Sequence, residues 1–511
     1  MKIALVSPKS LGNTLVAFPH GILQIAAELK KHGYTCDIFD FNVTNHSSND
    51  FLNKYDVVGL SVMSTQLRHA VEIVNGLNKT VKVIWGGVHC FLDPLSVVQK
   101  FPTHFVVSGE GEYPMLNLLK YFSGRENMEW LRGQNGICFY NDAPVINQPN
   151  FISDLNNLAD VNYYDMQEIE KYIFKKQYWF DMKKDVPLLD VLVGRGCYWK
   201  CSFCINSLYR KHKAYHRSKS IDKIRRETEN IIDDFNIRFV NPRDDDFYMD
   251  KKVVNDWKEY AKEKGFLWEA NFRFNYFTEK QLDEQEIKNF IDSGLYVINM
   301  AIEAGVEDIR NSILKKKVTD ADIFRAVERI NHSVGKKVAV GTSFIIDFPG
   351  DTQANKIREI QWMDYLHKHL NILFSGPQKY RSYPGSDLYT QEKDHKSGDL
   401  DYYLNNITQS GEIKSYKKRS YYQAFYSPFI QLYYNRKFQS FKINDDSTWD
   451  VSPNIKNRII SSFVFELLFL PIKIRLMLNF WVLFWEPHVI GFIFTQLEKL
   501  SENSRKFFKR I

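Results

Sequence analysis

The chain has 511 residues, of which 44% are hydrophobic, 15% aromatic and 25% charged. This composition supports roughly two to four domains with ordinary globular cores and argues against a globally disordered chain. A net charge of +7 without a long Lys/Arg block argues against a nucleic-acid partner. Six cysteines are too few for a disulfide framework, and the N-terminus lacks the apolar stretch of a signal peptide. The sequence therefore predicts a protein of the reducing cytoplasm.

The N-terminal region, residues 1–125, alternates between strand and helix patterns. Apolar runs predict strands at 2–7, 36–41, 57–62, 81–85 and 104–107, with helices at 21–32 and 68–77. This alternation is typical of a doubly wound, Rossmann-like parallel sheet, whose ligands bind beyond the carboxyl ends of the strands. Small and polar residues gather at those ends: Ser61, Ser64, Thr65, Gly86, Gly87, Gly109, Glu110 and Gly111. They are candidates for ligand contact, and the alternative is that they only form tight turns.

Residues 126–186 have a weak pattern with several Asn, Pro and Gly, and they are predicted to form a connector. A second alternating series follows from 187 to 400. Its predicted strands are 188–193, 237–240, 267–272, 296–302, 337–346 and 373–375, and Ser220 is a good N-cap for a helix over 221–235. About six βα units favour a partial TIM-type barrel, with its chemistry at the carboxyl ends of the strands.

The last region, residues 401–511, changes character. Its segment 459–494 is apolar and aromatic, but charged residues and prolines interrupt it, so no run reaches the about 18–20 residues of a membrane-spanning helix. We expect a helical region that caps the barrel. The alternative is peripheral contact with a membrane surface, because Lys and Arg interleave with Phe and Trp.

Three cysteines lie close together in the string GRGCYWKCSFC at 194–204, directly after a predicted strand. Cys197, Cys201 and Cys204 follow the spacing C-x3-C-x2-C. Soft thiolates select zinc or iron–sulfur clusters, and three of them can hold three irons of a cubane while the fourth iron stays open. One alternative is a zinc site completed by His212 or His216. The other is a set of three buried free thiols.

This string resembles the cluster-binding loop of the radical S-adenosylmethionine superfamily. The resemblance implies that Cys197, Cys201 and Cys204 are the metal ligands of a [4Fe–4S] cluster whose open iron binds S-adenosylmethionine. One electron, from an external donor such as flavodoxin or ferredoxin, would then cleave the cofactor to a 5′-deoxyadenosyl radical. Phe203, the aromatic residue before the third cysteine, would pack near the adenine.

Further strings resemble the superfamily in order. NPRDDDF at 241–247 resembles the strand end that contacts the methionine amino group, and Asp245 is its best candidate. Glu303, within AIEAG, resembles a residue that contacts the cofactor. FIIDFPGDT at 344–352 resembles a Gly-Leu-Pro-Gly-Glu-Thr turn, although Asp347 and Phe348 replace Gly and Leu. Arg273 and YPGS at 383–386 also have counterparts, and for each acid a surface or helix-capping role is the alternative.

The N-terminal region resembles the cobalamin-binding domains that are fused to radical enzymes. The resemblance rests on FPHGILQIA at 18–26, GGVH at 86–89 and GEGE at 109–112. It implies that the strand-end residues named above contact cobalamin, since small residues let the backbone approach a bulky ligand. The chain lacks the Asp-x-His-x-x-Gly string that supplies a lower-axial histidine in many B12 proteins. The alternative is a degenerate domain that binds no cobalamin and covers the barrel mouth.

Taken together, the two resemblances imply a cobalamin-dependent radical enzyme that methylates an unactivated carbon of a small-molecule or lipid-like substrate. A rival within the superfamily is cyclisation, rearrangement or oxidation without methyl transfer. A rival of another class is a zinc- or cluster-bearing binding module without turnover.

Overall fold

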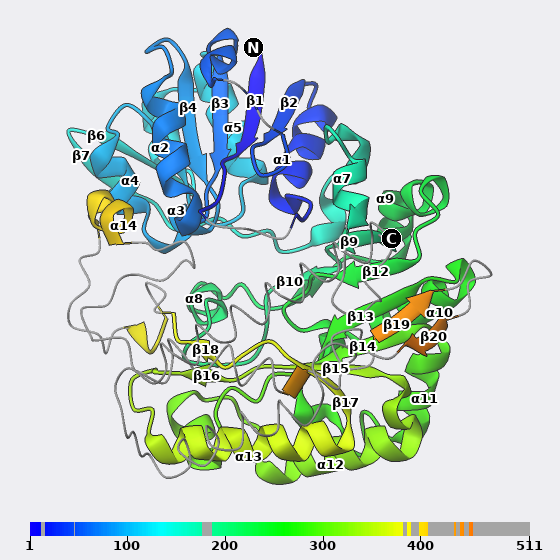
Figure 1. Cartoon of the computed structure of the whole chain (residues 1–511). Coiled ribbons are helices and arrows are strands. Elements are labelled where there is room, and N and C mark those ends of the chain that lie inside the picture. The colour runs from blue at the N-terminus through cyan, green and yellow to red at the C-terminus, as the bar shows by residue number, and fades with distance from the viewer. Residues whose placement is uncertain are drawn as a thin grey trace, which may run out of the picture. The chain divides into compact units, whose positions relative to one another are not determined.

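The computed structural model describes residues 1–11, 16–44, 46, 48–175 and 186–381, and the pieces 386–389, 398–406, 434–435, 440–443 and 449–452. Figure 1 shows how their helices and strands follow one another along the chain. The described residues fall into two compact units. The first contains those up to 271 and those from 381 to 406, and the second contains those from 272 to 380 and from 434 onwards.

The N-terminal part of the first unit is a seven-stranded sheet of order β2-β1-β3-β4-β5-β6-β7 (Figure 1). Five strands are parallel: β1 (Ile3–Ser7), β2 (Cys36–Asp40), β3 (Val57–Ser61), β4 (Lys82–Gly86) and β5 (Phe105–Val107). They are linked by α1 (His20–Lys31), α2 (Leu67–Asn75), α3 (Val88–Leu92), α4 (Pro94–Lys100) and α5 (Glu112–Phe122). The predicted doubly wound sheet is confirmed, and its parallel strands have the flavodoxin-like order.

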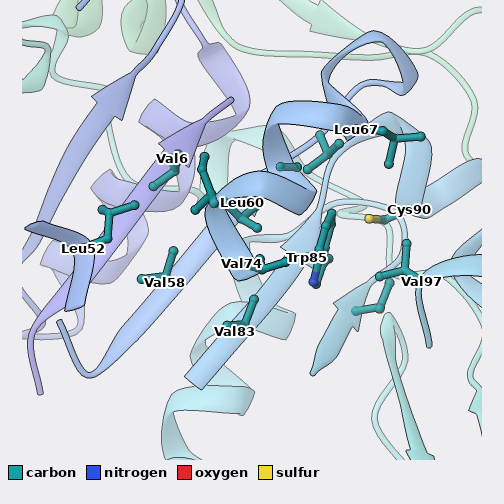
Figure 2. Packing of buried hydrophobic residues seen from close by; sticks show 14 of the residues in the cluster. Val6, Leu52, Val58, Leu60, Leu67, Val74, Val83, Trp85, Cys90 and Val97 are labelled. Atoms are coloured by element: carbon teal, nitrogen blue, oxygen red, sulfur yellow. The ribbon is translucent and has the colours of Figure 1, made fainter. Parts of the chain in front are cut away.

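A core of alternating strand residues holds this sheet against its helices. Figure 2 shows Val58 and Leu60 of β3 and Val83 and Trp85 of β4, which project on one side because successive strand residues alternate between faces. They pack with apolar side chains of α2 and α4. Trp85 is fully buried, and its indole Nε1 donates a hydrogen bond to Nδ1 of His104 at 3.1 Å. Each buried side chain of this kind contributes about 1.5–3 kcal/mol, which makes the sheet a rigid platform for the turns at its edge.

Residues 126–186, predicted as a connector, contribute to this sheet. Strand β6 (Ile137–Asn141) pairs antiparallel with β5, and β7 (Ala143–Ile146) pairs antiparallel with β6. They are followed by α7 (Glu170–Ile173) and by β8 (Phe174–Lys175), which pairs antiparallel with β9 (Val186–Val191) instead. The short helix α6 (Met128–Arg132) precedes them. The β6–β7 hairpin turns at Asp142, whose φ is 61°. Short edge strands tolerate Pro and Asn, so their residues lack the strong alternation by which a strand is predicted.

A βα repeat runs through the rest of both units. The first unit holds β9 (Val186–Val191), α9 (Ile221–Asp234), β12 (Phe239–Pro242), α10 (Lys251–Lys264) and β13 (Leu267–Asn271). The second holds α11 (Glu284–Asp292), β14 (Leu295–Asn299), α12 (Asp320–Ser333), β15 (Ala339–Thr342), α13 (Gln353–His369) and β17 (Asn371–Phe374). Within each unit these strands pair in parallel. The α/β class is confirmed, and Ser220 caps α9 as predicted, accepting a hydrogen bond from the Lys223 backbone N–H at 3.3 Å.

The described part of the C-terminal region contains both a helix and strands. α14 (Leu400–Asn406) contacts α2 and α4 of the N-terminal sheet, where Leu400 and Tyr403 join the core. β19 (Ser440–Ile443) and β20 (Trp449–Ser452) form an antiparallel hairpin. The apolar segment 459–494 lies outside the described residues. In the part of the chain that the structure describes, no helix is long and apolar enough to cross a bilayer.

Candidate active site

The three clustered cysteines lie on a loop that a two-stranded ribbon closes at its base. β10 (Gly194–Arg195) pairs antiparallel with β11 (Arg217–Ser218), and Arg195 stands directly opposite Arg217. We call these two strands the neck ribbon and residues 196–216, which include α8 (Asn206–Lys211), the cluster loop. Gly196 has a φ of 84°, and a Cβ there would lie 2.7 Å from the Tyr215 carbonyl oxygen. Glycine is therefore required where the loop leaves the ribbon.

The thiols of the cluster loop are partly or fully enclosed. Cys197 and Cys201 are buried, Cys204 is half-buried, and all three are free of disulfides. The Trp199 backbone N–H donates to Cys197 Sγ at 3.5 Å, and Asn206 Nδ2 donates to Cys204 Sγ at 3.7 Å. Burial, and then the nearby Asp246 carboxylate, raise the pKa of Cys197 to about 12. A metal bound here must therefore displace the thiol protons.

The donor set fits a [4Fe–4S] cluster in kind and number. The three thiols are soft ligands, N–H donors are aimed at two of the sulfurs, and the absence of a fourth cysteine from the cluster loop leaves one iron open. Among the described residues, no three His, Cys, Asp or Glu side chains are grouped tightly enough to surround one metal ion. A cubane does not require such grouping, since each thiolate binds a different iron.

The structure brings Asp245 next to the cluster loop. The Asn206 side chain, which contacts Cys204, also hydrogen-bonds the exposed Asp245 carboxylate. Phe203 is half-buried on the same loop. Asn206 was not a candidate from the sequence, because an amide two residues after a cysteine carries no pattern of its own.

Asp244 is a second residue that sequence reasoning missed. Its carboxylate is buried beneath the neck ribbon and accepts backbone hydrogen bonds from Val193, at 2.9 Å, and from Gly194. Burial raises the pKa of Asp244 to about 7, while these hydrogen bonds oppose the shift. The run of three aspartates after β12 was the available signal, but it did not distinguish the residue that supports the ribbon from the exposed one.

Glu303 lies in the second unit, where it pairs with a lysine. Its φ of 73° is unusual for a residue with a side chain, and such strain is common at ligand sites. The Glu303 carboxylate accepts a hydrogen bond from the Lys316 ammonium group at 3.0 Å, and both residues are buried. Arg273 donates to the Lys316 carbonyl, so the second unit brings Glu303, Lys316 and Arg273 together.

Asp347 stands where the resembling turn has glycine, and it adopts a backbone conformation that glycine favours. Asp347 has a φ of 60°, a region that glycine occupies most easily. Its carboxylate lies 2.6 Å from Lys356 Nζ, and its backbone N–H donates to Asp351 Oδ2 at 2.7 Å. An aspartate therefore holds the left-handed position with the help of these two contacts. Ser386 is the described residue of the YPGS string, and it is buried.

The turns after β3 and β4 meet at the edge of the N-terminal sheet that is formed by the carboxyl ends of its parallel strands. Ser61 and Gly86 are partners in register, and the Thr65 carbonyl oxygen accepts a hydrogen bond from Leu11 at 3.0 Å. Gly87 has a φ of 88°, and a Cβ there would lie 2.5 Å from the Val62 backbone nitrogen. Two apolar side chains are exposed at this edge, Met63 at 47% and Val88 at 37%. Sequence reasoning missed them because it considered only small and polar residues.

His89 is enclosed rather than presented at this edge. The side chain is fully buried, with Nδ1 3.1 Å from the Ser64 hydroxyl and Nε2 3.4 Å from the Ser96 hydroxyl. The Tyr403 ring of α14 packs edge-on against the imidazole. Burial lowers the pKa of His89 to about 3, so the ring is neutral near pH 7. Ser64, a predicted cobalamin contact, thus also fixes the orientation of a core histidine.

We expect His89 to make the protein sensitive to acid. The pKa is lowered on folding from 6.5 to about 3, so the unfolded chain binds a proton that the folded chain excludes. The stabilisation is therefore complete above pH 6.5 and is lost as the pH falls toward 3, by about 2 kcal/mol at pH 5. His89→Gln should flatten the fall of the melting temperature between pH 7 and pH 5. Replacing the exposed His332 should leave this slope unchanged, and an equal slope in both variants would contradict the expectation.

The turn after β5 reaches the neck ribbon. We call residues 109–112 the glutamate turn. Glu110 Oε1 lies 3.4 Å from Arg195 Nη1 and 3.0 Å from Arg217 Nη2, and Glu112 Oε1 lies 2.7 Å from Arg195 Nη2. Gly109 has a φ of 91°, and a Cβ there would lie 2.3 Å from the Asn150 carbonyl oxygen. The Glu110 carboxylate, predicted to contact cobalamin, is thus engaged by two arginines of the cluster loop's base.

Comparison with known proteins gives two family matches, which together cover more than half of the chain. Residues 14–119 match the B12 binding domain, and residues 191–360 match the Radical SAM superfamily. An uncharacterized methyltransferase of Pyrococcus horikoshii is 27% identical over 348 residues, which are 65% of this chain and 68% of that protein. The cytidylyl-2-hydroxyethylphosphonate methyltransferase of Streptomyces wedmorensis is 22% identical over 381 residues, 65% of this chain and 69% of that protein.

A solved structure shares the fold. The radical S-adenosylmethionine methyltransferase TsrM from Kitasatospora setae, with cobalamin and a [4Fe–4S] cluster bound, aligns with a TM-score of 0.58 and 15% identity. The alignment covers 76% of this chain and 74% of that one. The B12 binding match covers most of the N-terminal sheet, and the Radical SAM match contains the cluster loop. The chain therefore belongs to the radical S-adenosylmethionine superfamily, in the branch that carries an N-terminal cobalamin-binding domain.

Proposed function

We propose that this enzyme is a cobalamin-dependent methyltransferase that methylates an unactivated carbon of a small molecule. The observation that carries the proposal is the succession of a B12 binding domain and a radical SAM domain in one chain. Methyltransferases among its relatives support it. When bound, the cluster supplies the electron that cleaves S-adenosylmethionine to a 5′-deoxyadenosyl radical, and cobalamin carries the methyl group.

The residues of the cluster loop, and Asp245 beside it, have distinct tasks in this proposal. Cys197, Cys201 and Cys204 hold three irons. The Asp245 carboxylate accepts hydrogen bonds from the ammonium group of the methionine moiety, and its contact with Asn206 beside Cys204 supports this role. Phe203 packs against the adenine.

The edge of the N-terminal sheet supports cobalamin binding through its surface chemistry. Met63 and Val88 expose apolar side chains there, which suit the face of a large macrocycle. Gly87 lets the turn after β4 pack closely against the Val62 backbone beside them, since it carries no Cβ. His89 is buried between two serines, so the proposal assigns it no bond to cobalt.

The cysteines of the chain support a cytoplasmic location. None of the six cysteines is paired in a disulfide, as expected in a reducing compartment. The one-electron donor is a separate protein such as flavodoxin or ferredoxin.

Anaerobic turnover with purified protein tests the proposal. The protein, reconstituted with iron, sulfide and hydroxocobalamin, is incubated with S-adenosylmethionine and a reductant. Methyl transfer predicts that both 5′-deoxyadenosine and S-adenosylhomocysteine form. Deoxyadenosine without S-adenosylhomocysteine would reject methylation and favour a cyclisation, rearrangement or oxidation.

A further inference from the structure

The glutamate turn forms ion pairs with both arginines at the base of the cluster loop. Every cysteine ligand lies between Arg195 and Arg217, which are opposite partners in the neck ribbon. Glu110 binds Arg217 through both carboxylate oxygens, at 3.0 and 3.1 Å, and Glu112 binds Arg195 at 2.7 Å. A two-oxygen contact with a guanidinium fixes orientation as well as distance. Two carboxylates of the N-terminal sheet thus hold both sides of the loop's entrance.

The turn that supplies these carboxylates is itself fixed. The Glu110 backbone N–H donates to the Asn150 carbonyl at 2.8 Å, and Asn150 Nδ2 donates to the Glu110 carbonyl at 3.0 Å. Glu110 Oε2 also accepts the Ile152 backbone N–H at 2.7 Å. Glu112 is the first residue of α5, where a negative charge is favoured by the helix dipole. The two carboxylates are therefore held in fixed positions by the N-terminal domain.

These four charges are removed from solvent. The exposed fraction is 14% for the Arg195 side chain, 12% for Arg217, 9% for Glu110 and 2% for Glu112. Charges buried to this extent are stable only while they are paired. Loss of Glu112 leaves Arg195 and Arg217 to share the Glu110 carboxylate, with one positive charge in excess. The ribbon would then move to re-solvate that charge, and the first cysteine ligand, Cys197, lies two residues after Arg195.

A second contact holds the far end of the loop. The Tyr209 ring of α8, which follows Cys204, lies 4.6 Å from the ring of Phe91 in α3 and 5.5 Å from the ring of Phe151. Helix α3 follows the turn after β4. Turns after two neighbouring strands of the N-terminal sheet therefore touch the cluster loop, one at its base and one beyond its last cysteine.

We propose that Glu110 and Glu112 are positioning residues for the iron–sulfur cluster, acting on the cluster loop through Arg217 and Arg195 rather than through contact with cobalamin. This inference rests on the proposed function only in taking Cys197 as a cluster ligand. It means that the N-terminal domain sets the geometry of the cluster and of its bound S-adenosylmethionine, even when no cobalamin is present.

The test uses full-length protein reconstituted with iron and sulfide but without cobalamin. Glu112→Gln removes one charge and keeps the side-chain shape, and Glu129→Gln, at an exposed acid of α6, is the matched control. The readouts are iron content, the electron paramagnetic resonance spectrum of the reduced cluster with and without S-adenosylmethionine, and 5′-deoxyadenosine formation, all without cobalamin. Hydroxocobalamin affinity is then measured by absorbance titration. A circular dichroism melt of each variant reports folding.

Three results are expected for Glu112→Gln. The spectral change that S-adenosylmethionine induces in the cluster should be broadened or lost. Deoxyadenosine formation should fall about 10- to 100-fold, as for a misplacement near 1 Å. Cobalamin affinity should stay within about twofold, a change smaller than one lost hydrogen bond. The control variant should match the unchanged protein in every readout.

Other outcomes would overturn the proposal. Glu112 Oε2 has no hydrogen-bond partner among the described residues, so a cobalamin amide is the competing donor for this carboxylate. Weaker cobalamin binding with an unchanged cluster spectrum would assign Glu112 to cobalamin, and unchanged values throughout would remove any role. If Glu112→Gln does not fold, Arg217→Lys decides, because lysine keeps the charge but loses the two-point contact. An unaltered spectrum in that variant would also reject the proposal.

Failure of the proposed function would be a separate result. The cluster spectrum and deoxyadenosine formation are measured without cobalamin, so they respond to the glutamate turn whether or not a methyl group is transferred.

Discussion

Replacing any one of Cys197, Cys201 and Cys204 with alanine is expected to abolish stable cluster incorporation and to lower 5′-deoxyadenosine formation by more than about a thousand-fold. In the proposed site each thiol is the sole protein ligand of one iron, and no other cysteine lies on the cluster loop to replace it. Without the cluster, S-adenosylmethionine loses both its binding iron and its electron source. Iron and sulfide analysis, the absorption of the reconstituted protein and chromatography of the nucleoside product check this expectation.

Cys36→Ala is the matched control for this series. Cys36 is a half-buried free thiol at the start of β2, in the same compact unit as the cluster loop. Its removal should leave iron content and deoxyadenosine formation unchanged. The assignment of the three ligands fails if Cys201→Ala retains iron and turnover, or if Cys36→Ala loses them.

The features that sequence predicted best are local ones. Short apolar runs such as 57–62 identify buried parallel strands because both faces of such strands are covered. The cysteine spacing is also local, since all three candidate ligands lie between positions 197 and 204. Ser220 could be predicted as a cap for the same reason, because its partner Lys223 lies three residues away.

Long-range partners could not be predicted in this way. Glu112 and Arg195 are 83 residues apart, and Glu110 and Arg217 are 107 apart. The glutamates follow a strand of one domain and the arginines flank a loop of the next, so only the fold brings their charges together. From the sequence, Glu110 could be assigned only a ligand role, because a pattern records its place after a strand and not its distant partners.

Backbone strain also escapes a sequence pattern. Glu303 and Asp347 occupy left-handed conformations, with φ values of 73° and 60°, although neither is glycine. Each is held by a lysine contact, to Lys316 and to Lys356. Propensity alone predicts extended or helical backbone at both positions, and the tertiary contacts that override it are not visible before the fold is known.

Gly109→Ala is expected to destabilise the protein by about 3 kcal/mol or more, whereas Gly33→Ala should cost only about 1 kcal/mol. Both glycines are left-handed, with φ values of 91° and 80°, so an added Cβ strains the backbone at either site. The difference lies in the space around them. A Cβ on Gly109 would meet the Asn150 carbonyl oxygen at 2.3 Å, and a Cβ on Gly33 would meet nothing within 4 Å. The Asn150 oxygen is backbone that accepts the Glu110 N–H, so it cannot withdraw without breaking that hydrogen bond.

Thermal unfolding of the full-length variants measures this difference. The excess cost at Gly109 should lower its melting temperature by roughly 4–8 °C relative to Gly33→Ala. Because Gly109 precedes the carboxylate that holds Arg217, the same variant should also disturb the cluster spectrum, which Gly33→Ala should not. Equal melting temperatures would mean that the glutamate turn accommodates a methyl group without loss of stability. The inference that this turn is rigid would then be wrong.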